Sequence, residues 1–134
     1  PAFFRRQRQM CIRDSPNFSE KEFQCKHTGI CDMDKDFMEI LSEIRKEYGK
    51  PMIITSGYRH PTDPVESSKP SRGEHTYGVC CDVSVRGEDC YNLISVCIKK
   101  GITRLGVSQK GENRFIHIGI GYGDKFLNPW VWSY

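Results

Sequence analysis

The residues with the clearest chemical potential are His75, Asp82 and His117. His75 lies seven residues before Asp82, and His117 follows much later in the segment Phe-Ile-His-Ile-Gly. Two imidazoles and one carboxylate form a ligand set typical of catalytic zinc, which keeps a fourth position open for water. A structural zinc site more often closes with four protein ligands, usually including several cysteines. The sequence therefore predicts a catalytic-type zinc site at these three positions.

Three motifs in a fixed order surround these residues. Residues 54–59 read Ile-Thr-Ser-Gly-Tyr-Arg, residues 75–82 follow the pattern His-x-x-Gly-x-Cys-x-Asp, and residues 115–117 read Phe-Ile-His. In this order they resemble the M15 family of zinc D-Ala-D-Ala peptidases, in its small bacterial and phage branch. The resemblance runs from about residue 17 to residue 134. It implies a hedgehog/DD-peptidase-like fold, Zn²⁺ as cofactor, and peptidoglycan peptides as substrate. The expected activity is that of a D-Ala-D-Ala carboxypeptidase or an endolysin-type endopeptidase.

Arg59 is the expected substrate-binding and catalytic residue. A guanidinium beside a zinc site can hold a substrate carboxylate or stabilise a developing oxyanion. The alternative is an arginine held in a structural salt bridge. The resemblance favours the first interpretation, because the matching arginine of the family contacts substrate. The neighbouring His60 either touches substrate or is an exposed loop residue.

The general base expected of a metallopeptidase is missing from its usual positions. Several relatives carry Glu three residues before the last histidine or His two residues before it, and close relatives often carry Asp two residues after it. These positions hold Arg114, Phe115 and Gly119 here. The substitutes that the sequence offers, without ranking them, are Glu74, Glu112 and Asp124.

This missing base supports a second hypothesis for the function. The chain would then be a phage virion or cell-wall-binding module that keeps the fold and the metal but hydrolyses weakly or not at all. A third hypothesis is a zinc-stabilised interaction domain without a cell-wall ligand, because a fold alone does not fix a function.

The elements that must position the site follow from hydrophobic periodicity and from start and stop signals. Helices are expected after Ser19, after Asp34 as far as Tyr48, and over 88–100. Strands are expected over 51–56, 79–86, 104–108 and 114–120, the last two as a hairpin, with a long loop over 57–74 and an aromatic tail over 129–134. The expected fold class is α+β, a small antiparallel sheet with helices packed on one face.

Alternation along the strand at 79–86 assigns its two faces. Val79, Cys81, Val83 and Val85 are expected in the core, and Asp82 faces the site from the opposite side. Cys80 shares that side, so its thiolate could bind zinc, although tight packing beneath the metal is the favoured role. On the later strand, His117 likewise points away from the apolar face.

Cysteine spacing leaves the redox state open. Cys90 and Cys97 share a helix face and are expected to be small buried hydrophobes. Cys25 and Cys31 lie in a loop where a disulfide is plausible. Together with His27 they could instead form part of a second metal site, or the segment is a plain loop.

The length of the chain indicates one domain over 16–134. Its charge gives no reason to expect binding to nucleic acid or to an anionic membrane. Residues 1–15 match the translation of a sequencing-library adapter and are interpreted as a non-native scar; the alternative is a short basic arm. Setting aside the four arginines and one aspartate of that segment leaves 16 basic and 16 acidic residues from the original 20 and 17. We therefore expect no nucleic-acid partner, no membrane span and a monomer. No secretory signal opens the sequence, and the localisation stays open.

Overall fold

The three helices expected from the sequence are present close to their predicted bounds. The computed structural model describes residues 18–134. Helix α2 (Glu20–Phe23) follows Ser19, whose backbone N–H donates to the Glu22 carboxylate at 2.7 Å. Helix α3 (Lys35–Tyr48) is capped by the Asp34 side chain and ends at Gly49. Helix α5 (Gly87–Lys99) has acidic residues in its first turn, where they favour the helix dipole.

Within residues 18–134, five strands form one mixed sheet in the order β1-β2-β4-β3-β5. Their bounds are Ile53–Ser56, Cys80–Ser84, Arg104–Ser108, Phe115–Gly119 and Trp130–Ser133 for β1 to β5. The predicted hairpin of β3 and β4 is confirmed as an antiparallel pair. The α+β class is also confirmed, but the sheet is not wholly antiparallel. The aromatic tail forms β5, which pairs with β3 in parallel. The connection over 120–129 reverses the chain direction after β4, so that β5 runs in the same direction as β3.

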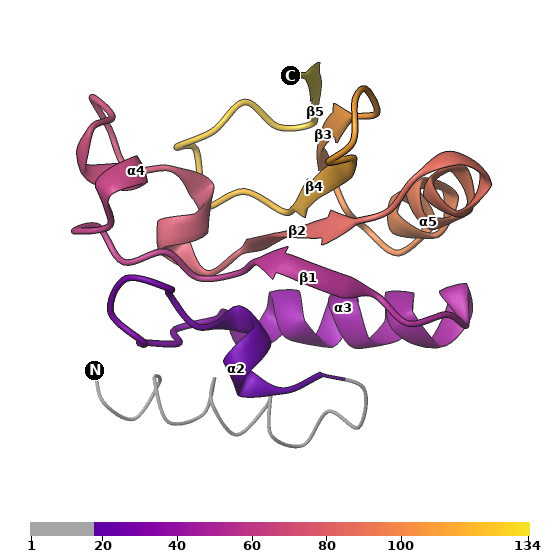
Figure 1. Cartoon of the computed structure of the whole chain (residues 1–134), viewed down its shortest axis with the longest axis horizontal. Coiled ribbons are helices and arrows are strands. Elements are labelled where there is room, and N and C mark those ends of the chain that lie inside the picture. Colours follow the sequence, from indigo (N-terminus) through magenta and orange to yellow (C-terminus); the bar gives the residue numbers. More distant parts are fainter. Residues whose placement is uncertain (1–17) are drawn as a thin grey trace.

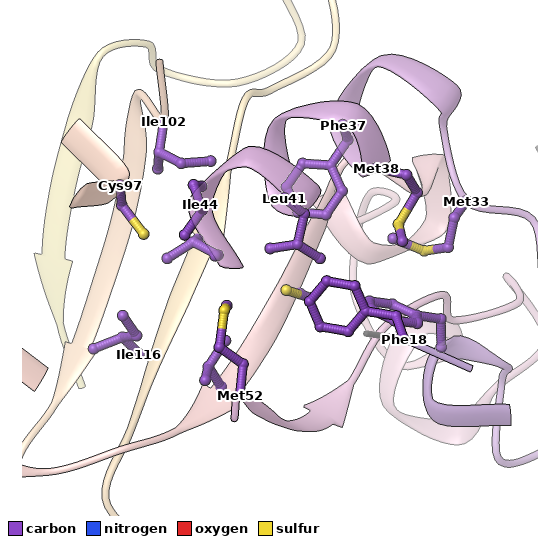
Figure 2. Packing of buried hydrophobic residues seen from close by; sticks show 14 of the residues in the cluster. Phe18, Met33, Phe37, Met38, Leu41, Ile44, Met52, Cys97, Ile102 and Ile116 are labelled. Atoms are coloured by element: carbon purple, nitrogen blue, oxygen red, sulfur yellow. The ribbon is translucent and has the colours of Figure 1, made fainter. Parts of the chain in front are cut away.

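The hydrophobic core lies between the sheet and the helices (Figure 1). Helix α3 contributes Phe37, Leu41 and Ile44, all fully buried, and α5 contributes Leu93 and Cys97. Figure 2 shows several of these side chains meeting those of the sheet. From the sheet come Cys81 and Val83 of β2 and Ile116 and Ile118 of β4. This arrangement confirms the predicted alternation and turns the intervening residues of β2 and β4 toward the other face.

The segment between β1 and β2 is more ordered than the predicted loop. It contains α4 (Pro64–Ser67), which starts after Asp63, and η1 (Glu74–Tyr77), a 3-10 helix. Figure 1 places α4 beyond the end of the sheet where β1 finishes and β2 starts. Proline at the first helical position and a capping Asp63 explain α4, since both satisfy requirements of a helix start.

The six cysteines of the described part are free and buried, so the disulfide considered between Cys25 and Cys31 is not formed. Burial raises the pKa of Cys31 to about 12 and that of Cys97 to about 12. His27 is exposed, and within residues 18–134 it joins neither cysteine in a metal-binding group. This result favours the plain-loop interpretation.

The N-terminal segment and the possibility of a membrane-spanning helix were also considered from the sequence. The segment interpreted as an adapter scar, residues 1–15, lies outside the described residues. In residues 18–134, every helix is too short or too polar to cross a membrane.

Candidate metal centre

The sheet register brings Asp82 and His117 together. The two residues are direct partners in the antiparallel pairing of β2 and β4. Both occupy the face turned away from α3, because their neighbours Cys81, Val83 and Ile116 face the core. Side chains of directly opposed residues lie close together on one face. Two of the three predicted ligands are therefore positioned by strand pairing alone.

His75 reaches the same place from η1. The 3-10 helix ends at Gly78, which has a φ of 70° and leads directly into β2. A Cβ at position 78 would lie 2.2 Å from the carbonyl oxygen of Asp32, and the Gly78 carbonyl accepts from the Asp34 N–H. Both the left-handed conformation and the close backbone approach require glycine. Gly78 thus fixes the turn between η1 and β2, and this turn places His75 beside the sheet.

The donor atoms of the three residues converge. Asp82 Oδ1 lies 3.5 Å from His75 Nε2 and 3.1 Å from His117 Nδ1. Zinc–ligand distances of about 2.0–2.2 Å in a tetrahedron place neighbouring donor atoms about 3.4 Å apart. The observed separations fit this spacing, and the donor types are those that zinc prefers.

Hydrogen bonds fix the orientation of both imidazoles. His75 Nδ1 donates to the Gly57 carbonyl at 2.7 Å, which leaves Nε2 as the unprotonated nitrogen of a neutral ring. His117 Nε2 lies 2.7 Å from Glu74 Oε1. Burial alone would lower the pKa of His117, but the carboxylates of Asp82 and Glu74 on either side of the ring raise it. Burial acts in the opposite sense on Asp82, whose pKa is nevertheless lowered by the neighbouring imidazoles of His117 and His75.

Cys80 offers an alternative third ligand. Its sulfur and one nitrogen each of His75 and His117 all lie within 4.8 Å of one another. The thiol is fully buried, and burial, with the nearby carboxylates of Glu74 and Asp82, raises its pKa well above the usual range. We favour Asp82 as the ligand, because its carboxylate is already ionised whereas the thiol would first have to lose a proton.

A cleft of about 460 Å³ opens above these residues. His75, Asp82 and His117 line it together with Arg59. A second hollow of about 330 Å³ shares Arg59 and Asp82 with the first, so the two adjoin. The predicted site residues are therefore brought together, apart from His60, whose ring is hydrogen-bonded to Thr62 and does not line either hollow.

Arg59 is held in place by neighbouring side chains. Its Nη1 donates to Glu66 Oε2 at 2.8 Å and its Nη2 to Ser56 Oγ at 3.0 Å. The structural salt bridge considered from the sequence is thus present. It uses two of the five N–H donors of the guanidinium, so Arg59 can still bind a ligand in the cleft.

Several residues of the cleft were not predicted from the sequence. Lys69 comes from the segment assigned to a loop, and its Nζ lies 2.9 Å from Oε2 of the buried Glu66. Trp132 comes from the expected aromatic tail and also lines the cleft. It lies beside Gly106, where a Cβ would meet its indole at 2.5 Å, and its ring centroid is 5.0 Å from that of His117. The side chains that complete the aromatic wall are Phe115, Phe126 and Tyr134.

The three substitute general bases are placed differently from one another. Glu112 lines a separate pocket beside Tyr48 and Arg114. Asp124 is exposed in the connection between β4 and β5 and does not line the cleft. Glu74 does line the cleft, but its carboxylate is bonded to His117, Arg104 and Gly121.

Comparison with known proteins gives one family match. A search of curated proteins found no match. The sequence model of the family described as Peptidase M15 matches residues 16–119, a range that includes the three motifs and the predicted ligands. This match covers more than half of the chain, and the chain therefore belongs to the peptidase M15 family.

Proposed function

We propose that this protein is a zinc-dependent peptidase that hydrolyses peptidoglycan peptides at or next to D-amino acids. It would act as a monomer, as a D-Ala-D-Ala carboxypeptidase or as an endolysin-type endopeptidase. The observation that carries the proposal is the convergence of His75 Nε2, Asp82 Oδ1 and His117 Nδ1 in a cleft of a chain that belongs to a metal-dependent peptidase family.

The three converging residues would hold the zinc ion. When bound at such a site, zinc polarises a carbonyl group and lowers the pKa of water. His75 and His117 present defined nitrogens because the opposite side of each ring is hydrogen-bonded. Asp82 supplies the negative charge, and its lowered pKa keeps it ionised at neutral pH despite its burial.

The rest of the cleft suits a peptide that carries a carboxylate. Arg59 and Lys69 place two cations along one wall, and both share Glu66 as an anchor. A guanidinium with free donors can bind a terminal carboxylate or stabilise a developing oxyanion. The Glu66 carboxylate partly balances the charge of these two cations. The aromatic side chains Phe115 and Trp132 provide apolar contact for the peptide.

A second candidate function rests on the carboxylates of the cleft. Glu74 and Asp82 are the acidic residues among its described lining, and both already lie against the His117 imidazole, at 2.7 Å and 3.1 Å from its two nitrogens. A peptidase also needs a group that accepts a proton from the attacking water. This observation favours a weakly active or non-catalytic phage virion or cell-wall-binding module. We therefore expect slow turnover.

Mass spectrometry of peptidoglycan fragments incubated with zinc-loaded protein tests the activity. We expect slow hydrolysis at bonds next to D-alanine or another D-residue, and complete loss of hydrolysis after chelation. The masses of the products distinguish the carboxypeptidase from the endopeptidase. If no fragment is cleaved within a day while zinc is bound, the peptidase proposal fails. Co-sedimentation with intact peptidoglycan then tests the binding module.

A further inference from the structure

Glu74 is a buried carboxylate whose bonding is complete without solvent. Oε1 accepts from Arg104 Nε at 2.9 Å and lies 2.7 Å from His117 Nε2, and Oε2 accepts from the Gly121 N–H at 2.9 Å. Its side chain is 3% exposed. The Arg104 guanidinium and the Gly121 N–H can only donate, so the Glu74 carboxylate accepts from both.

The backbone leaves room for this carboxylate. A Cβ at Gly119 would lie 2.1 Å from Glu74 Oε2, so a side chain at position 119 would displace it. Gly119 follows His117 by two residues on β4 and lies on the same face. Arg104, which directly opposes Gly119 in the β3–β4 pairing, contacts the carboxylate from the next strand. Elements far apart in sequence therefore meet at Glu74.

Because Glu74 is an acceptor, the proton of a neutral His117 ring must lie on Nε2. Nδ1 then carries the free lone pair, and this is the nitrogen beside Asp82 Oδ1. A carboxylate on the distal nitrogen of a metal-binding histidine fixes the ring orientation and makes the ligand more basic. His75 has a neutral carbonyl in the corresponding place, so the two imidazoles differ.

We infer that Glu74 is a positioning residue for the metal site, acting through His117, and is not the general base. This inference rests on the proposed zinc ligands. It assigns to the protein a carboxylate–histidine–metal arrangement in which hydrogen bonds from Arg104 and Gly121 hold the Glu74 carboxylate against His117. Loss of such a partner weakens metal affinity by roughly 10–100-fold.

Zinc titrations of Glu74→Gln test the inference. All three partners of Glu74 are hydrogen-bond donors, whereas an amide has only one accepting oxygen. Glutamine therefore removes the negative charge and places its NH₂ group, itself a donor, against at least one of these donors. We expect the zinc Kd, measured by competition with a chelating dye, to rise roughly 10–100-fold. Thermal melting of the zinc-free proteins checks that the variant is folded.

Glu66→Gln is the matched control. Glu66 is also buried, with two cationic partners on Oε2 and a backbone N–H from Gly73 on Oε1, but it contacts neither imidazole. We expect Glu66→Gln to lose stability without loss of zinc affinity. Equal zinc affinities of folded Glu74→Gln and wild type would overturn the inference while leaving the zinc proposal intact. A wild type that binds no zinc would overturn both.

A measurement on the wild type avoids any folding defect of the variants. Long-range ¹H–¹⁵N correlation spectra of the zinc-loaded protein report which nitrogen of each imidazole carries a proton. We expect the proton of His117 on Nε2. A proton on Nδ1 of His117 would contradict the inference.

Discussion

At the scale of single residues, the donors of the site are oriented by neighbours that the ligand motif does not contain. His75 is held by the carbonyl of Gly57, and Arg59 by Glu66 and Ser56. These hydrogen bonds restrict rotation, so a cation or a substrate would meet side chains that are already in place. Preorganised donors lose less conformational entropy when they bind. The chemistry proposed for the cleft therefore depends on buried polar contacts as much as on the ligands themselves.

Arg59→Ala should reduce peptide cleavage by about two orders of magnitude or more, the scale of losing an oxyanion partner. The reason is that Arg59 lines the cleft and uses two of its five N–H donors for Glu66 and Ser56. Steady-state assays on a D-alanine-terminated peptide measure the effect. Arg114→Ala is the control, because Arg114 does not line the cleft. If Arg59→Ala lowers the melting temperature but leaves kcat/KM unchanged, the salt bridge is the whole role of Arg59.

At the scale of elements, period-two alternation predicted which face of β2 and β4 carries Asp82 and His117. Local signals also predicted α3, because Asp34 and Gly49 are strong start and stop residues. The partners of the ligands could not be predicted in this way. The bond between Glu74 and His117 joins residues 43 positions apart, and it depends on how η1 packs against β4. The parallel pairing of β5 was also missed, because a short aromatic tail carries no signal for its strand partner.

Gly78→Ala should destabilise the protein and weaken zinc binding together. A left-handed conformation costs a residue with a side chain about 1–2 kcal/mol. At position 78 the added Cβ also meets the Asp32 carbonyl, so the loss should be larger and η1 should shift. Chemical denaturation and zinc titration measure the two effects.

Gly111→Ala is the control for the backbone term of this prediction. Gly111 has a φ of 71°, but a Cβ there has nothing within 4 Å. We expect Gly111→Ala to show only the conformational cost and an unchanged zinc Kd. Equal losses of stability in the two variants, with zinc binding intact in both, would show that η1 does not position His75.

At the scale of the whole molecule, the core and the site occupy opposite faces of one sheet. Helices α3 and α5 cover the apolar face, and the segment containing α4 and η1 brings His75 and Arg59 to the other (Figure 1). This division leaves the polar network of the site outside the hydrophobic core, where its charges keep partners and partial access to solvent. The family match over 16–119 spans the elements from α2 to β4.

Removal of residues 1–14 should leave stability unchanged within a few degrees of the melting temperature. The expected scar carries no hydrophobic periodicity that could dock it, and the family match begins at residue 16. Thermal melts of the full chain and of a chain that starts at Ser15 provide the comparison. A large decrease after truncation would instead indicate a native, packed arm.

The most direct test of the central claim is the zinc content of purified, dialysed protein. We predict one zinc ion per chain in the wild type and a large loss in His117→Ala and Asp82→Ala. Cys80→Ala should retain zinc, as should His60→Ala, which removes an imidazole outside the cleft. Full zinc in folded His117→Ala would contradict the account. Zinc lost in Cys80→Ala but kept in Asp82→Ala would replace the carboxylate with the thiolate as the third ligand.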